Sequence, residues 1–288
     1  MLLNRNKMKT AEELKEVVKE TYSAIALQSK EENETSCCGA GECGTVDHAV
    51  FADNYDSLKG YAPDANLGLG CGLPTEFAQI KEGDTVVDLG SGAGNDCFVA
   101  RAIAGDSGKV IGLDMTPIMV EKAQQNAEKL GFNNVEFRLG DIENMPIAGK
   151  IADVVVSNCV LNLVPNKAQA FDEMYRIIKP GGHFSVSDVV LKGELPESIK
   201  EEGEMYAGCV SGAIQKDEYM NLLVNAGFQN IVVQKEKEVI LPDDILSKYL
   251  SKTEVEEYKS GNKGIYSVTV YGDKPVDEAC CTPESGCC

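Results

Sequence analysis

The chain has 288 residues, 43% of them hydrophobic and 25% charged, a composition that excludes wholesale disorder, a collagen-like chain and a coiled coil. Lysine and arginine total 27 against 46 aspartate and glutamate residues, and the formal charge of −19 would repel nucleic acid and an anionic membrane surface. The 11 cysteines are unusual beside only 2 histidines and no tryptophan.

The N-terminus indicates a compartment in which these cysteines stay reduced. Its first twenty residues, MLLNRNKMKTAEELKEVVKE, lack the apolar core of a signal peptide, and no stretch of the chain approaches membrane-spanning length. We therefore expect a cytoplasmic protein with no membrane partner. Because disulfides are rare in the cytoplasm, the cysteines are expected to have a function other than cross-linking the fold.

The first seventy residues predict one amphipathic helix followed by an irregular segment. Apolar residues recur at helical spacing between about residues 10 and 28. Residues 37–44 (CCGAGECG) combine three cysteines with three glycines and show no periodicity, so we expect a loop there. Short helices and turns are expected over residues 45–80.

From about residue 82, strands and helices alternate. Short apolar runs predict strands at residues 85–89, 109–113, 135–139, 154–157 and 183–190. Helices are expected over residues 96–104, from Pro117 to Gly131, and through Phe171, Met174, Ile177 and Ile178 up to the Pro180-Gly181-Gly182 stop. This alternation is typical of an α/β fold with a parallel sheet covered by helices on both faces.

The C-terminal third predicts a smaller lobe of mixed structure. Residues 197–260 are mostly helical in pattern, interrupted by a strand at 231–239, and a last strand is expected at 264–270. The acidic end of the chain is expected to be flexible. We accordingly divide the chain into an N-terminal helix and cysteine-rich segment, a core, a C-terminal α+β lobe and a cysteine-containing tail, at residues 1–70, 71–192, 193–272 and 273–288.

A glycine-rich turn follows the first strand of the core. Residues 88–94 (DLGSGAG) give G-x-G-x-G after an acid, whereas a dinucleotide fingerprint requires G-x-G-x-x-G. Asp114 ends the second strand, where it could accept hydrogen bonds from two ribose hydroxyls. Asp141 and Ile142 follow the third strand, where they could receive an adenine amine and cover the adenine face. An acid before the turn suits a cofactor with an ammonium group and no phosphate.

S-adenosyl-L-methionine (SAM) is such a cofactor, whereas NAD would need the helix N-terminus for its pyrophosphate. Together with residues 179–182 (KPGG), these motifs resemble the class I SAM-dependent methyltransferases over about residues 75–190. The resemblance implies a Rossmann-like sheet. It also implies a cofactor site made of Asp88, Gly90, Ser91, Gly92, Gly94, Asp114, Met115, Asp141, Ile142 and Asn158.

Three single cysteines stand in glycine-rich or strand-end loops. Cys71 precedes the first strand, Cys159 follows the fourth and Cys209 lies after the fifth. Zinc sites usually show C-x-x-C pairs or histidines at short spacing, which these cysteines lack. Single thiolates converging on a methyl-transfer site suit a soft three-coordinate centre with a lone pair, such as trivalent arsenic. By contrast, Cys97 is expected to pack in the core.

Residues 68–72 (GLGCG), 88–98 (DLGSGAGNDCF), 157–163 (SNCVLNL) and 206–209 (YAGC) together resemble the arsenite SAM methyltransferases. The resemblance implies that Cys159 and Cys209 hold As(III), and that Cys71 with a further N-terminal cysteine completes the thiol set. Cys37, Cys38 and Cys43 could each be that residue, and Cys38 is favoured. Arsenite or its thiol conjugates would be the substrate, with thioredoxin or glutathione as reductant.

Two other functions stay open on the sequence. A methyltransferase for carbon or oxygen of a small metabolite, such as a quinone or sterol precursor, would share the cofactor motifs and leave the cysteines incidental. A non-enzymatic soft-metal-binding protein would use the N-terminal cysteines and the tail cysteines Cys280, Cys281, Cys287 and Cys288. The intact SAM motifs argue against this second alternative.

Overall fold

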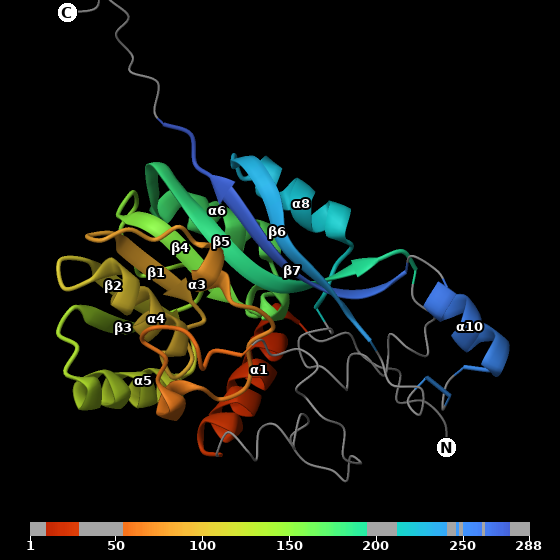
Figure 1. The fold of residues 1–288 in the computed structure, drawn as a ribbon, viewed down its shortest axis with the longest axis horizontal. Coiled ribbons are helices and arrows are strands. Elements are labelled where there is room, and N and C mark those ends of the chain that lie inside the picture. Colours follow the sequence, from red (N-terminus) through yellow and green to blue (C-terminus); the bar gives the residue numbers. More distant parts are fainter. Residues whose placement is uncertain are drawn as a thin grey trace, which may run out of the picture.

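A seven-stranded mixed sheet runs through the molecule, with helices on both of its faces (Figure 1). The structure is a computed structural model that describes residues 10–28, 54–194, 212–240, 246–247, 250–260 and 263–276. In spatial order the strands are β3 (Val135–Leu139), β2 (Lys109–Asp114), β1 (Thr85–Leu89), β4 (Ala152–Asn158), β5 (Ile178–Lys192), β7 (Gly264–Asp273) and β6 (Gln229–Val239). Strands β1 to β5 pair in parallel, and β7 is antiparallel to both of its neighbours.

The central strands of the sheet are buried on both faces because helices cover each of them. The helical segments are α1 (Ala11–Ala26), η2 (Pro63–Ala65), α3 (Pro74–Phe77), α4 (Asn95–Ala104), α5 (Pro117–Leu130), η3 (Leu161–Leu163), α6 (Lys167–Ile177), α8 (Lys216–Asn225) and α10 (Lys252–Ser260). Alternate residues of β1 show the division. Val86 packs in one cluster with α4 and α5, whereas Val87 and Leu89 pack in another with α6 and α8. A parallel sheet with two apolar faces requires this arrangement.

Local sequence signals set the ends of α5 and match the prediction. Thr116 is the N-cap and Pro117 the first helical residue, where its missing N–H costs nothing. Gly131 ends the helix at φ 69°, the left-handed conformation that glycine adopts without steric penalty. The predicted N-terminal helix is also confirmed as α1, which opens with a capping box between Thr10 and Glu13.

The predicted boundary between α6 and β5 was wrong. We expected the helix to include Ile178 and stop at Pro180, but α6 ends at Ile177 and Ile178 already lies in β5. Ile178 pairs with Ala152 of β4, and this parallel pairing draws it into the sheet. The glycines expected to terminate the helix thus lie within the strand, where Gly181 adopts φ 80°. Non-local pairing overrode the local helical pattern here.

The two strands expected in the C-terminal lobe, β6 and β7, are hydrogen-bonded into the same sheet as β1 to β5. The division of the chain at residues 70, 192 and 272 stays a prediction. The cysteine-rich stretch at 37–44, the segment holding Cys209 and the cysteines of the tail lie outside the described residues.

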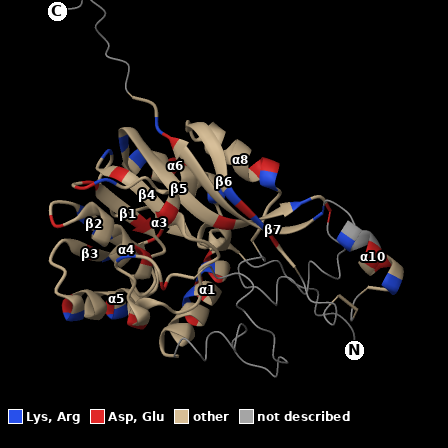
Figure 2. Ribbon diagram, viewed as in Figure 1, with Lys and Arg blue, Asp and Glu red and all other residues tan. Residues whose placement is uncertain are grey.

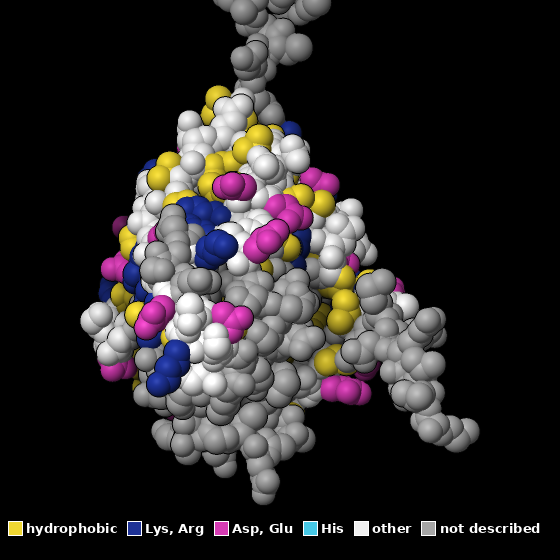
Figure 3. Space-filling model, turned by 90° about the vertical axis from the view of Figure 1, so that its right-hand side faces the viewer, with side chains coloured by type: hydrophobic (Ala, Val, Ile, Leu, Met, Phe, Trp, Pro, Cys, Tyr) yellow, Lys and Arg dark blue, Asp and Glu magenta, His cyan; other side chains and the backbone are white. Residues whose placement is uncertain are grey.

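Charges of both signs are interspersed over the described surface. Figure 2 shows acidic and basic residues along each of the helices α1, α5 and α10. Figure 3 shows both kinds again on one face of the molecule, mixed with hydrophobic side chains. On these three helices acidic and basic side chains are therefore interspersed rather than segregated.

Candidate active site

A cavity of about 1070 Å³, part of it open to solvent, lies at the carboxyl ends of β1, β2 and β4. Ligands of open α/β sheets bind at this edge. Most of the residues expected to hold the cofactor line the cavity, namely Asp88, Gly90, Ser91, Gly92, Asp114, Met115, Asp141, Ile142 and Asn158. Gly94 instead forms the N-cap of α4. The fold thus gathers into one cavity residues that are spread over seventy positions of the chain.

Gly90 begins the turn after β1, and no other residue type fits there. Its φ is 72°, and a Cβ on it would lie only 2.1 Å from Cγ2 of Val160. The backbone N–H groups of Gly90 and Ser91 donate to the carbonyl of Leu113, at 2.7 and 3.0 Å. These bonds fix the turn against β2, so that bare backbone faces the cavity.

Two polar atoms of the cavity lining have no hydrogen-bond partner among the described residues. They are Oγ of Ser91 and Oδ1 of Asn95, and both are buried. A buried polar atom without a partner costs free energy, and a polar ligand in the cavity would remove that cost. The lining therefore fits a polar molecule such as SAM better than a wholly apolar one.

The carboxylate of Asp114 is held in a fixed orientation at the end of β2. The backbone N–H of Gly92 donates to Oδ2 at 2.9 Å, and that of Thr116 donates to Oδ1 at 2.8 Å. Burial raises the pKa of Asp114, and the backbone donors partly offset this rise. Each oxygen keeps a further lone pair, so the group can accept from two vicinal hydroxyls such as those of a ribose.

Two buried acids lie together at the β1 end of the cavity. Asp88 is 1% exposed, and burial followed by the charge of Asp96 raises its pKa well above the ordinary range. Burial also raises the pKa of Asp96, to about 6, against the effect of hydrogen bonds from Asn158 and Tyr55. Paired buried carboxylates favour a cation between or beside them. The ammonium group of SAM has the required charge.

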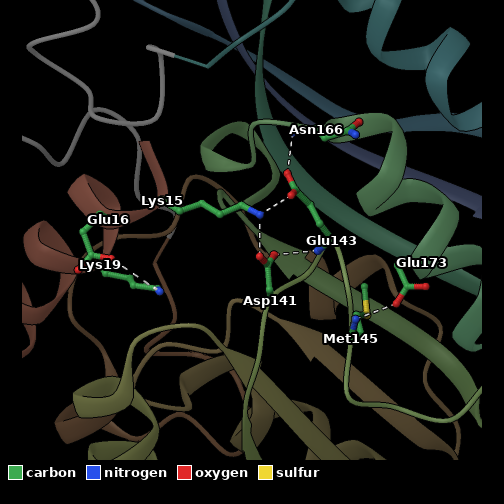
Figure 4. A network of polar contacts seen from close by, with 8 residues as sticks. All are labelled: Lys15, Glu16, Lys19, Asp141, Glu143, Met145, Asn166 and Glu173. Atoms are coloured by element: carbon green, nitrogen blue, oxygen red, sulfur yellow. Dashed lines mark hydrogen bonds and ion pairs between the residues drawn. The ribbon is translucent and has the colours of Figure 1, made fainter. Parts of the chain in front are cut away.

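Asp141 is joined to the N-terminal helix by an ion pair (Figure 4). Nζ of Lys15 in α1 donates to Oδ2 of Asp141 at 2.6 Å and also to Glu143. The backbone N–H of Glu143 donates to the other oxygen of Asp141, at 2.9 Å. Burial lowers the pKa of Lys15, but the two carboxylates outweigh this effect and the pKa rises. Lys15, Val18 and Tyr22 line the cavity, so α1 contributes to the cofactor site.

Replacing Lys15 with methionine is expected to loosen α1 and to weaken binding of S-adenosylhomocysteine (SAH), the demethylated cofactor, by about 3- to 10-fold. The side chain keeps its length but loses both charge-assisted hydrogen bonds. Hydrogen–deuterium exchange over residues 11–26 and SAH titration measure the two effects. Lys19→Met is the matched control, because among the described residues Lys19 pairs only with Glu16 of its own helix, at 3.9 Å. Equal exchange and affinity in both variants would contradict the role of Lys15.

Cys71 and Cys159 are brought together in one buried cluster. They are 2% and 3% exposed and share this cluster with Val189 and Leu191 of β5. Cys159 also lines the cofactor cavity. It adopts φ 61°, which is uncommon for a residue other than glycine, and its N–H donates to the carbonyl of Ser187 at 2.8 Å. Strained backbone of this kind is concentrated at functional sites.

The loop of Cys71 is held from two sides. Its N–H donates to Oδ1 of Asn158 at 3.1 Å, and its carbonyl accepts from the hydroxyl of Ser267 at 2.6 Å. The other two expected arsenic ligands, Cys38 and Cys209, lie outside the described residues. Within the described ranges no cluster of three or more His, Cys, Asp or Glu side chains is arranged to hold a metal ion.

Cys97 is buried on α4, as expected, and its thiol also has a polar partner. Sγ donates to Oδ2 of Asp88 at 3.2 Å. The sequence motifs predict core packing for Cys97 and no role for Lys15 or Tyr55, which both line the cavity. Neither residue lies in a recognisable motif, so the sequence contained no local signal for them. Asp96 lies within residues 88–98, one of the stretches that carry the family resemblance, but the resemblance assigns it no role in the site.

Comparison with known proteins identifies the family. Residues 80–227 match the family described as a methyltransferase domain. The arsenite methyltransferase of Halobacterium salinarum is 38% identical over 278 residues, which is 92% of this chain and 68% of that protein. The chain belongs to the arsenite methyltransferase family. The human arsenite methyltransferase is 42% identical over 168 residues, covering 55% of this chain and 44% of that protein.

A solved structure agrees with this membership. The arsenic(III) S-adenosylmethionine methyltransferase of Chlamydomonas reinhardtii is 32% identical, with a TM-score of 0.61, over 73% of this chain and 69% of that chain. The predicted class I methyltransferase fold, the dependence on SAM and the enzymatic character are thereby confirmed. The alternative of a non-enzymatic soft-metal-binding protein is set aside. No helix in the described ranges is long and apolar enough to cross a membrane.

Proposed function

We propose that this methyltransferase transfers methyl groups from SAM to trivalent arsenic held by cysteine thiolates, converting arsenite and methylarsenite for detoxification. One observation carries the proposal: Cys71 and Cys159 share a buried cluster, and Cys159 also lines the cofactor cavity. Thiolates are the ligands that soft centres prefer. A methyltransferase acting on carbon or oxygen would not need two buried thiols at this position.

The cavity residues would hold the cofactor in defined roles. Asp114 would accept from the ribose hydroxyls, Asp141 from the adenine amine, and Asp88 with Asp96 would face the ammonium group. When bound, SAM supplies an electrophilic methyl group on a sulfonium that leaves as a neutral thioether. The chain needs no general base, because the arsenic lone pair carries no proton. Its contribution is to position the two reactants and to exclude water.

The proposed thiol set is Cys71, Cys159, Cys209 and Cys38. Methyl transfer to the lone pair raises arsenic formally from the trivalent to the pentavalent state. Two cysteine thiolates would return two electrons, restoring trivalent arsenic and becoming one disulfide. Thioredoxin or glutathione would then reduce that disulfide by thiol–disulfide exchange.

Purified protein incubated with SAM, arsenite and a thiol reductant is expected to form methylated arsenic, detected by liquid chromatography with arsenic-specific mass spectrometry. Omission of SAM should abolish the product. SAH release without any arsenic product, in the presence of a quinone or sterol precursor, would instead favour the carbon or oxygen methyltransferase alternative.

A further inference from the structure

A chain of hydrogen bonds joins the cofactor cavity to the loop that carries Cys71. Its central residue, Tyr55, is 6% exposed and lines the cavity. Oη of Tyr55 lies 3.0 and 3.1 Å from the carboxylate oxygens of Asp96, and 3.2 Å from the carbonyl of Gly72. Nδ2 of Asn158 donates to the same Oη, at 2.6 Å. One hydroxyl thus contacts an acid of the cavity, the residue before Cys159 and the residue after Cys71.

The side-chain amide of Asn158 extends this chain of contacts to the backbone of both cysteines. Its Nδ2 also lies 2.9 Å from the carbonyl of Gly72 and 3.1 Å from Oδ2 of Asp96, while its Oδ1 accepts from the N–H of Cys71. A Cβ on Gly70 would lie 2.6 Å from Nδ2, so the loop packs directly on the amide. Cys159 follows Asn158 in the chain. The amide therefore constrains the backbone at Cys159 through the peptide chain and the backbone at Cys71 through hydrogen bonds.

At the cavity end of this chain of contacts lies Asp96, whose carboxylate can interact with charged ligands. Asp96 is 8% exposed and lies close to Asp88 at the same end of the cavity. A cationic ligand in the cavity would therefore attract both carboxylates and restrict their motion. Tyr55 and Asn158 can both donate to Asp96, and the same two groups contact the carbonyl of Gly72. A ligand that orders Asp96 consequently orders part of the thiol site as well.

We infer that Tyr55 is a positioning residue through which an occupied cofactor cavity aligns Cys71 and Cys159, so that the cofactor and trivalent arsenic bind cooperatively. The inference rests on the proposed function, because it takes arsenic as the ligand of the two thiols. The second ligand to bind finds these groups already ordered and so loses less conformational entropy. Linkage requires the effect to be reciprocal, so that arsenic raises cofactor affinity by the same factor.

Tyr55→Phe isolates the hydroxyl. The ring packs with Leu73 and Val99 and stacks on Tyr61 at a centroid distance of 6.3 Å, contacts that phenylalanine retains. SAH serves as the cofactor probe because it permits no turnover, and arsenite with a thiol reductant serves as the arsenic probe. The measured quantity is the ratio of SAH dissociation constants without and with saturating arsenite.

Wild-type protein is expected to show a coupling ratio of at least about 5, and Tyr55→Phe a ratio below about 2. SAH affinity without arsenite should change by less than about 3-fold, since phenylalanine keeps the ring in the cavity lining and removes only the hydroxyl. The reverse titration, arsenite with and without SAH, should give the same ratios. Tyr61→Phe is the matched control and should keep the wild-type ratio, because its hydroxyl contacts Asn66 and stands outside this chain of contacts.

Asp96→Asn tests the same chain of contacts from the cavity side and should also lower the ratio. Thermal melting establishes that each variant is folded. A wild-type ratio of 1 with normal binding of both probes, or an undiminished ratio in folded Tyr55→Phe and Asp96→Asn, would overturn the inference and leave the proposed function intact. Failure of wild-type protein to bind arsenite would overturn both.

Discussion

Replacing Cys159 with serine is expected to lower methyl transfer to arsenite by at least about 100-fold while leaving SAH affinity within about 2-fold of wild type. Serine nearly matches the volume of cysteine, and its backbone can adopt φ 61° as readily as that of cysteine, so the fold should be kept. Its hydroxyl is not ionised at neutral pH and is a hard ligand, whereas arsenic requires a soft thiolate. The loss therefore arises from arsenic binding alone.

Turnover with SAM, arsenite and a thiol reductant measures the first effect, and calorimetric titration with SAH measures the second. Retained SAH binding shows that the serine variant is folded and that its cavity is intact. Wild-type turnover in this variant would refute Cys159 as an arsenic ligand and would favour a methyltransferase whose cysteines are incidental.

Asp114→Asn is expected to have the complementary effect, weakening SAH binding by about 100-fold while arsenite still binds. Each hydrogen bond between the charged carboxylate and a ribose hydroxyl contributes about 1.5 kcal/mol or more. Asparagine loses one of these bonds and the charge that strengthens the other, a cost of up to about 3 kcal/mol, which corresponds to about 100-fold in affinity. Asparagine keeps the shape of the side chain but turns one acceptor into a donor.

Titrations with SAH and with arsenite, carried out on the same preparation, separate the two binding events. Asp106→Asn is a matched control, because the Asp106 side chain is 90% exposed and pairs with Arg101 at the surface, where such pairs contribute little. If SAH bound equally well to Asp114→Asn and Asp106→Asn, the assignment of Asp114 to the ribose would be wrong.

Local sequence patterns were sufficient to predict the sheet core and the residues at its carboxyl edge. Short valine-rich runs predicted the parallel strands, and Pro117 and Gly131 marked the ends of α5. Asp88 and Asp114 were predicted from their positions at strand ends, because in a parallel sheet all carboxyl ends meet at one edge. Such information is local, since it depends on residue spacing within a single strand, turn or helix.

The tertiary structure alone decided how distant segments complete the site. Lys15 pairs with Asp141, 126 positions away, and Asn158 holds the loop of Cys71 across 87 positions. Tyr55 joins Asn158 and the loop of Cys71 to Asp96 with a hydroxyl that no motif marks. The same holds for Ile178, whose pairing with β4 ended α6 early. Contacts of this kind depend on how the whole chain packs, and the free energy that fixes them is gained only when the elements meet. The sequence therefore determined the fold class and the cofactor, whereas packing determined which side chains connect the cofactor cavity to the cysteine loops.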